Sequence, residues 1–135
     1  MSRHSLRQSP RSIITGAGSG FGRALAVELA RRSGSLVLSD VNLPGLEETA
    51  ALARAAGASS VTTLRCDVAE LADVEAVAAA AGNAPIDLVV NNAGISCGGL
   101  VGEVSISDWK KTIDIDLWGD IYGCHVFTPI LRRQG

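Results

Sequence analysis

Four glycines at alternate positions stand between a short apolar run and an amphipathic segment: Gly16, Gly18, Gly20 and Gly22. Glycine tolerates positive φ angles and lets a ligand approach the backbone closely. A helix that begins at such a turn offers unpaired N–H groups and the positive end of its dipole, and both attract phosphate. Ser19 adds a hydroxyl donor. These residues suggest a pyrophosphate-binding turn, although glycine-rich turns also occur as plain tight connections.

The spacing of these glycines excludes two well-known phosphate motifs. GxGxxG counted from Gly16 needs glycine where Phe21 stands, and counted from Gly18 it needs glycine where Arg23 stands. The Walker A motif fails because no lysine follows the loop. The pattern that is present is TGxxxGxG, which begins at Thr15.

Further polar residues stand at the expected ends of three more strands. Asp40 comes eighteen residues after Gly22, close to the offset at which an acid meets the hydroxyls of an adenosine ribose and repels a 2′-phosphate. Asp67 and Val68 end a third apolar run, where they could flank an adenine. The sequence NNAG, residues 91–94, ends a fourth. Each of these features alone is also an ordinary turn.

The order of apolar runs and helical patterns indicates how these residues are positioned. Short β-branched runs alternate with longer helical patterns, which favours βαβ units and a parallel sheet. We expect strands over residues 12–15, 35–40 and 61–68, and over residues 85–94 a fourth strand that runs into a turn. We expect helices after the glycine loop, over residues 43–57, over residues 71–82, and in a long last segment. Gly34 and Gly57 are the expected stops of the first two helices.

The last helix is expected to begin at the N-cap Ser107. Apolar residues recur every four positions along it and predict one apolar stripe: Trp109, Ile113, Leu117 and Ile121. The acidic segment DIDLWGD resembles a calcium loop only superficially. Trp118 and His125 stand where that loop needs an oxygen ligand and a glutamate, so we reject calcium and predict no metal.

Composition limits the class of protein. The chain has 135 residues, 47% of them apolar, and a net charge of -2, which fits one soluble domain with a real core. It does not fit a basic nucleic-acid binder, and no apolar run reaches the roughly 20 residues that span a bilayer. Three cysteines without CxxC spacing favour a cytoplasmic location. Residues 1–11 are expected to be a basic, flexible tail.

Taken together, these features resemble the short-chain dehydrogenase/reductase family, from about Arg11 to the end of the chain. TGAGSGFG, Asp40, DV at 67–68 and NNAG at 91–94 occur in the family's order and spacing. The resemblance implies a Rossmann-like, doubly wound α/β fold with strand order 3-2-1-4, which we expect to be truncated before a fifth strand. Residues 12–135 are then an NAD-binding domain. The implied activity is hydride transfer between nicotinamide and an alcohol or carbonyl substrate.

The resemblance also implies which residues form the site. The implied cofactor-binding residues are Gly16, Ser19, Gly20, Phe21, Gly22, Asp40, Asp67, Val68, Asn91, Ala93 and Gly94. Asp40, together with Ala17, implies that NAD is preferred over NADP. Asp116 stands where the family carries an asparagine of its catalytic group. An ionised aspartate cannot donate a hydrogen bond, so a proton relay at that position is in doubt.

The family's central catalytic group is absent from these residues. A tyrosine works there as general acid and base because a lysine four residues later lowers its pKa. Here the one tyrosine, Tyr122, is followed four positions later by Val126, and no lysine occurs after Lys111. We therefore expect the chain to be a cofactor-binding half that is inactive alone and takes a substrate only when completed.

Two interpretations stay open: a fragment of an NAD-dependent dehydrogenase, or a non-catalytic dinucleotide-binding or interaction module. A methyltransferase is a remote third, because it needs an acid just before the first glycine, where Thr15 stands. In a truncated fold, the fourth strand is left as an open edge and the last helix lacks part of its packing surface. Exposed edges and apolar patches predict marginal stability or association between copies of the chain.

Overall fold

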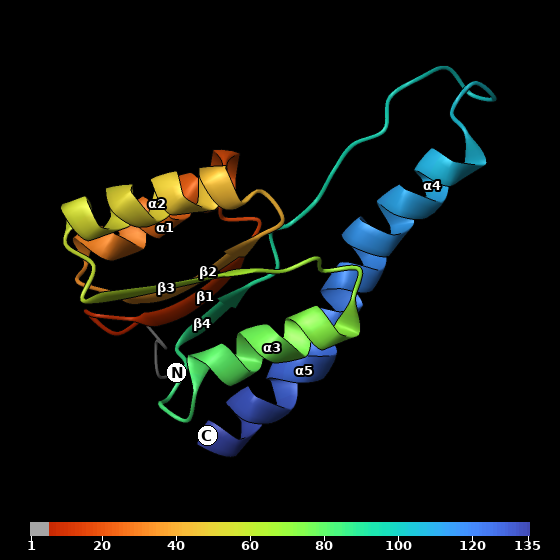
Figure 1. The fold of residues 1–135 in the computed structure, drawn as a ribbon. Helices are drawn as coiled ribbons and strands as arrows, with labels where there is room; N and C mark the ends of the chain where they lie inside the picture. The colour runs from red at the N-terminus through yellow and green to blue at the C-terminus, as the bar shows by residue number, and fades with distance from the viewer. Residues whose placement is uncertain (1–5) are drawn as a thin grey trace.

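The computed structural model describes residues 6–135, which form a four-stranded sheet with helices on both faces (Figure 1). The strands are β1 (Arg11–Thr15), β2 (Ser35–Asp40), β3 (Ser60–Arg65) and β4 (Leu88–Val90). The helices are α1 (Gly20–Arg31), α2 (Leu43–Ala56), α3 (Leu71–Ala81), α4 (Ile106–Ile113) and α5 (Gly119–Gln134). A π-helical segment, η1 (Asp114–Trp118), joins α4 to α5.

The strand order is β3-β2-β1-β4 and every pair is parallel, which confirms the predicted Rossmann-like α/β fold. β1 is central and pairs with β2 on one side and β4 on the other, with Ile14 opposite Leu38 and Val90. Its residues are buried on both faces, which explains why its sequence is a continuous apolar run rather than an alternating one.

Each face of the sheet has its own core. Ile14 and Leu38 point to one face, where they pack with Leu46 and the alanines of α1 and α2. Because successive side chains in a strand point to opposite faces, Ile13 points to the other core, which also contains Phe127 of α5. Figure 1 shows these two layers, with α1 and α2 on one side of the sheet and α3 and α5 on the other.

The ends of the first two helices differ in kind. Gly57 ends α2 with φ of 108°, as predicted, in the left-handed region that favours glycine. The prediction that Gly34 ends α1 is wrong. The helix ends at Arg31 and Ser33 takes the positive φ of 56°. Gly34 lies beyond it, where a Cβ would be only 2.8 Å from Leu29 O.

Strands β3 and β4 are shorter than predicted, because side chains replace their ladder hydrogen bonds. Beyond β3, the N–H of Asp67 donates to Asp73 Oδ2 at 2.9 Å, and the N–H of Ala69 donates to Asp67 Oδ1 at 3.0 Å. Beyond β4, the N–H of Asn92 donates to the hydroxyl of Thr15 at 3.0 Å. Asp67 and the NNAG segment therefore lie in loops that continue the strands.

The last helical region begins at Ser105 rather than at the predicted Ser107. Ser105 has an extended backbone, and its hydroxyl accepts the N–H of Asp108 at 3.0 Å. The same hydroxyl donates to Asp108 Oδ2 at 2.7 Å, so Ser105 and Asp108 are joined by two hydrogen bonds at the start of the helix. Ser107 has no acid three residues later and lies within the first turn of α4.

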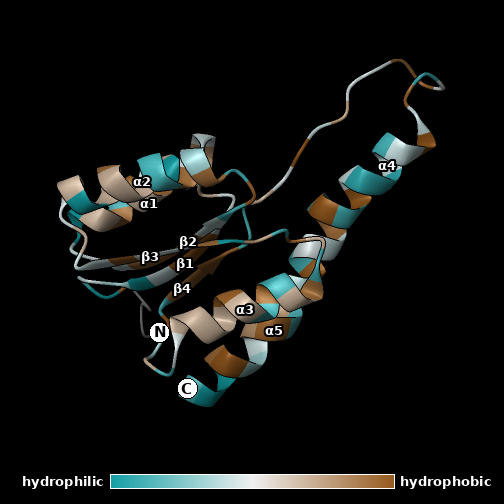
Figure 2. Cartoon of the chain, in the orientation of Figure 1, coloured by the Kyte–Doolittle hydropathy of each residue, from teal (hydrophilic) through white to brown (hydrophobic). Residues whose placement is uncertain are grey.

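The predicted apolar stripe of the last helical region is exposed. Trp109 is 50% and Leu117 55% exposed, and Ile113 and Ile121 are similar. Contact with the core comes instead from Phe127, on α5. Figure 2 shows α4 extending away from the sheet with hydrophobic and hydrophilic residues along it. The expected association between copies stays a prediction.

The start of the described chain is more ordered than a free tail. Pro10 is buried, Arg7 forms an ion pair of 3.0 Å with Asp87, and Arg11 opens β1. The predicted tail of residues 1–11 therefore overlaps the fold, and its first five residues lie outside the described part. Within residues 6–135, no helix has both the length and the apolar character needed to cross a membrane.

Candidate functional site

A cleft of about 330 Å³ lies where the carboxyl ends of the strands meet. β2 lies on one side of β1 and β4 on the other, so the chain leaves β1 at the point where the strand order reverses. In open α/β sheets this is where ligands bind. The glycine loop, the end of β2, and the loops after β3 and β4 all contribute lining residues.

Nine of the eleven predicted cofactor residues line this cleft: Gly16, Ser19, Gly20, Phe21, Asp40, Asp67, Val68, Ala93 and Gly94. They come from four separate loops, so only the tertiary fold brings them together. Among them Phe21 stands out because it is 74% exposed, which is unusual for a large apolar side chain. Their role in binding a cofactor stays a prediction.

Gly22 does not line the cleft but supports the loop that does. A Cβ at this position would collide with the carbonyl oxygen of Gly16 and with Asn92 Nδ2. Gly16 itself has φ of 65°, and a Cβ there would lie 2.7 Å from Ala93 Cα. Both glycines are therefore required for the loop to pack closely against the start of α1 and the NNAG segment.

Asn91, the other predicted residue outside the cleft, faces α5. A Cβ at Gly123 would collide with the Asn91 side chain, so helix and side chain pack directly together. Asn92, which sequence reasoning did not single out, faces the cleft instead. Its Nδ2 donates to Thr15 O at 3.0 Å and to Gly16 O at 3.1 Å. The doubled asparagine was visible in the sequence, but only the fold assigns one to each side.

The Thr15 hydroxyl joins the end of β1 to the end of β4, the neighbouring edge strand. It accepts the N–H of Asn92 at 3.0 Å and the N–H of Ala93 at 3.2 Å. Thr15 is only 3% exposed, so these bonds are shielded from water. Together with the Asn92 amide, they fix the floor of the cleft between the glycine loop and the NNAG segment.

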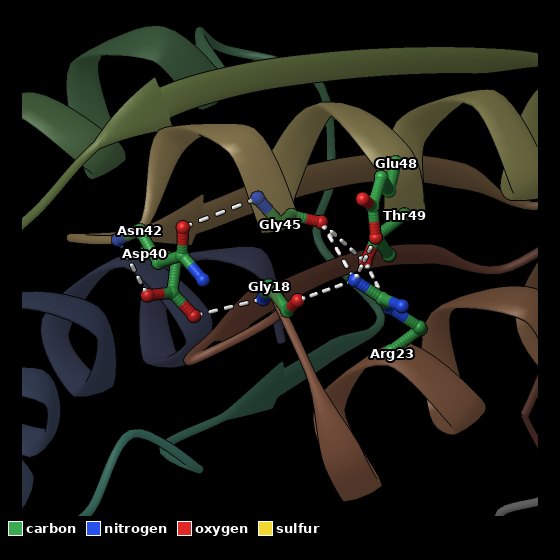
Figure 3. Close-up of polar contacts among 7 residues, drawn as sticks. All are labelled: Gly18, Arg23, Asp40, Asn42, Gly45, Glu48 and Thr49. Carbon is green, nitrogen blue, oxygen red and sulfur yellow. Dashed lines mark hydrogen bonds and ion pairs between the residues drawn. The ribbon is translucent and has the colours of Figure 1, made fainter.

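The Asp40 carboxylate is held by two backbone donors (Figure 3). Its Oδ2 accepts the N–H of Gly18 at 2.8 Å, and its Oδ1 accepts the N–H of Asn42 at 2.9 Å. A Cβ at Gly18 would lie 2.8 Å from Asp40 Oδ2, so the loop rests directly on the carboxylate. An ionised carboxylate has about four acceptor positions, so each oxygen keeps capacity for a ligand hydroxyl.

The other acidic residues near the cleft also have structural contacts. Asp67 Oδ1 accepts the N–H of Ala69 in the turn after β3. Asp116, in η1, is exposed and does not line the cleft, but its Oδ1 accepts the N–H of the lining residue Ile95 at 2.8 Å. Partial burial, and then the negative charge of Asp116, raise the pKa of Asp120 above its usual value.

Tyr122 and Cys66 carry the phenol and the thiol considered as reactive groups near the site. Tyr122 lies on α5 beside Trp118, with ring centroids 5.7 Å apart, and does not line the cleft. Cys66 lines the cleft but is buried. Burial, reinforced by the negative charge of Asp73, raises the pKa of this thiol to about 11. Within residues 6–135 no cluster of three or more His, Cys, Asp or Glu could hold a metal ion.

Asn92→Asp tests the joint between the glycine loop and the NNAG segment. The new carboxylate would face the carbonyl oxygens of Thr15 and Gly16, so we expect a loss of about 1–3 kcal/mol in the free energy of unfolding at pH 7. The loss should shrink as the pH falls toward about 4, because protonation removes the charge. Urea denaturation at both pH values measures it. Asn83→Asp, in an exposed turn, is the control, and an equal loss in both variants would contradict the assignment.

The three thiols should react at different rates. At pH 8, a thiol with pKa of about 11 is ionised to only roughly one part in a thousand, and Cys66 is also buried. We expect iodoacetamide to modify the exposed Cys124 first, and Cys66 only at higher pH or after unfolding in urea. Peptide mass mapping reads the order. Modification of Cys66 as fast as Cys124 would contradict the burial and the raised pKa of the Cys66 thiol.

Comparison with known proteins places the chain in a family context. A family model described as short chain dehydrogenase matches residues 11–135. The chain is 45% identical over 128 residues to the oxidoreductase SadH of Mycobacterium tuberculosis. The matched stretch covers 92% of this chain and 45% of SadH. It is 38% identical over 125 residues to 11-beta-hydroxysteroid dehydrogenase A of Sesamum indicum, covering 90% and 36% respectively.

Solved structures of other proteins have the same fold over most of this chain. A short chain dehydrogenase/reductase from Burkholderia phymatum in complex with NAD matches with a TM-score of 0.89 at 40% identity, covering 96% of this chain and 47% of that one. Levodione reductase matches with a TM-score of 0.89 at 34% identity, covering 96% and 52%. The chain thus spans about half or less of the length of these proteins.

Proposed function

The chain belongs to the short-chain dehydrogenase family, and from that premise we propose that its cleft binds the adenosine and pyrophosphate parts of NAD. The observation that carries the proposal is the meeting of a glycine loop and the Asp40 carboxylate at one cleft, at the reversal of strand order. We further propose that the whole protein transfers hydride between nicotinamide and an alcohol or carbonyl substrate. The relative from Burkholderia phymatum, which is in complex with NAD, supports this.

The pyrophosphate is proposed to bind at the start of α1. Ser19 is the N-cap residue of this helix, and its side chain makes no capping hydrogen bond, so its hydroxyl is available to a ligand. The first turn carries no acidic residue that would oppose an anion. The N–H groups of that turn and the helix dipole would stabilise the phosphate charge. Gly16 and Gly20, both with positive φ, allow close approach.

The adenosine is proposed to bind between the ends of β2 and β3. Asp40 would accept hydrogen bonds from the ribose hydroxyls, while Asp67 and Val68 would flank the adenine. Among residues 6–135, no lysine or arginine lines the cleft, so a 2′-phosphate would meet the Asp40 charge without a compensating cation from these residues. This combination supports a preference for NAD over NADP.

When bound, the nicotinamide would donate or accept the hydride. This chain's own residues hold the dinucleotide, and Asp116 holds the loop at Ile95 that borders the cleft. Tyr122 lies away from the cleft and has no lysine four residues later. We therefore propose that the acid/base group comes from a part of the protein corresponding to the remaining length of its relatives, and that these residues alone are inactive.

We also propose a cytoplasmic location and an association of the chain through its exposed surfaces. The three cysteines are free, which supports a reducing compartment such as the cytoplasm. β4 is an edge strand of the described sheet, and most apolar residues of α4 and η1 are exposed. Such surfaces favour contact with another chain or with further residues of the same protein.

The role of Asp40 is tested by comparing the two dinucleotides. We expect NAD to bind the intact gene product about tenfold or more tightly than NADP in isothermal titration calorimetry. Asp40→Asn keeps the shape but removes the charge, so the difference should narrow to a few-fold. Asp40→Arg should narrow or reverse it. Glu47→Gln, an exposed acid on α2, is the charge-matched control. Equal affinities in the unmodified protein would refute the role.

The intact mass of the natural gene product separates the dehydrogenase from a non-catalytic binding module. We expect a mass well above 13.9 kDa, with a serine and a Tyr-x-x-x-Lys sequence in the additional part. A mass of 13.9 kDa would mean that the product lacks the acid/base group, and would favour the non-catalytic module. Mass spectrometry of the protein from its source cells gives the answer directly.

A further inference from the structure

Arg23, on α1, connects the glycine loop to α2 (Figure 3). Its Nη2 lies 2.7 Å from Gly18 O, 3.1 Å from Gly45 O and 3.0 Å from Glu48 Oε2. Its Nε donates to Thr49 Oγ1 at 2.9 Å. One planar guanidinium therefore joins the loop to the first two turns of the neighbouring helix. Arg23 is not among the residues that line the cleft.

Gly18 is held from both sides. Its carbonyl accepts from Arg23, and its N–H donates to Asp40 Oδ2 at 2.8 Å. The two contacts belong to successive peptide groups, joined by the φ and ψ angles of a glycine, the residue with the greatest backbone freedom. Without the Arg23 contact, the Gly18 carbonyl could rotate, and the N–H would no longer be held against the Asp40 carboxylate.

The far side of this connection is rigid. Thr49 is fully buried, and its hydroxyl also donates to Gly45 O at 3.1 Å. The N–H of Gly45 donates to Asn42 Oδ1 at 3.2 Å, and Asn42 in turn donates its own N–H to Asp40 Oδ1. Both carboxylate oxygens of Asp40 are thus held by segments that the Arg23 guanidinium ties together.

The charge of Arg23 is directed away from the cofactor cleft. Its acceptors are the Gly18 carbonyl in the glycine loop and three groups of α2, namely a backbone carbonyl, a buried hydroxyl and the Glu48 carboxylate. A planar fork of N–H donors suits several acceptors at once, whereas a lysine ammonium acts as a single point charge. The identity of this residue should therefore matter as well as its charge.

We propose that Arg23 is a positioning residue for cofactor selection: it acts through Gly18 to fix the Asp40 carboxylate in the orientation that accepts ribose hydroxyls and excludes a 2′-phosphate. The proposal rests on the proposed function of the cleft. It assigns discrimination between the two dinucleotides partly to a side chain that contacts neither of them. A loosened carboxylate loses hydrogen bonds to NAD and also turns its charge away from NADP.

The experiment measures dissociation constants for NAD and NADP by isothermal titration calorimetry on the intact gene product. We expect Arg23→Met to weaken NAD binding about tenfold while NADP binding changes less than about threefold, so the preference falls. Arg31→Met is the control, because Arg31 is on the same helix and, within residues 6–135, its one ion pair is with the exposed Glu28 at 3.2 Å. It should change neither constant.

A purely structural role for Arg23 predicts a different pattern. If the side chain only supported the fold, both affinities would fall in the same proportion, and that result would overturn the proposal. In an Asp40→Asn background, Arg23→Met should cause no further loss of preference, because the charge through which Arg23 acts is gone. A further loss of equal size would also overturn it.

If the Arg23→Met variant does not fold, the same two dissociation constants are measured on Arg23→Lys. A lysine can reach only part of the acceptor set, so we expect an intermediate preference, and an unchanged preference would count against the proposal. An unmodified protein that binds neither dinucleotide would overturn the proposed function and this inference with it. A preference for NAD that survives in Arg23→Met would overturn this inference alone.

Discussion

The parallel alignment of β1 between β2 and β4 is the constraint on which the rest of this structure depends. Buried backbone groups must be hydrogen-bonded, and the central strand meets that requirement only by pairing on both sides. Pairing in parallel brings the carboxyl ends of all the strands to one edge of the sheet. The glycine loop, Asp40, Asp67 and the NNAG segment meet at a single cleft for this reason.

Where the strands end, side chains continue their hydrogen bonding and shape the cleft. Thr15 and Asn92 join the ends of β1 and β4, and Asp40 joins the end of β2 to the glycine loop. These side chains bond to the protein's own backbone and so fix the relative positions of the loops that line the cleft. The described part of the chain places no basic residue in the cleft lining, so a pyrophosphate bound there would depend on backbone N–H groups and the dipole of α1.

The helical region after the NNAG segment shows a different balance. Phe127 of α5 is buried in the core, whereas Trp109 of α4 and Leu117 of η1 are exposed. Asp116 lies in η1, the π-helical segment between α4 and α5, and its carboxylate accepts the N–H of Ile95. This hydrogen bond joins the helical region to the border of the cleft. SadH and the Burkholderia phymatum protein are about twice as long as this chain.

Apolar periodicity and glycine spacing, which are local properties of the chain, were enough to predict alternating strands and helices and a ligand-binding turn after β1. The strand order and nine residues of the cleft lining followed from the resemblance to a known family, because its motifs recur here in the same order and spacing. The sequence did not reveal that Ser105 rather than Ser107 caps α4, since both serines have the right chemistry and only the reciprocal contact with Asp108 separates them. It also could not assign Asn91 to α5 and Asn92 to the cleft, or connect Arg23 to Gly18. Those facts depend on which side chain faces which neighbour, and the packing of α1, α2 and α5 against the sheet decided them.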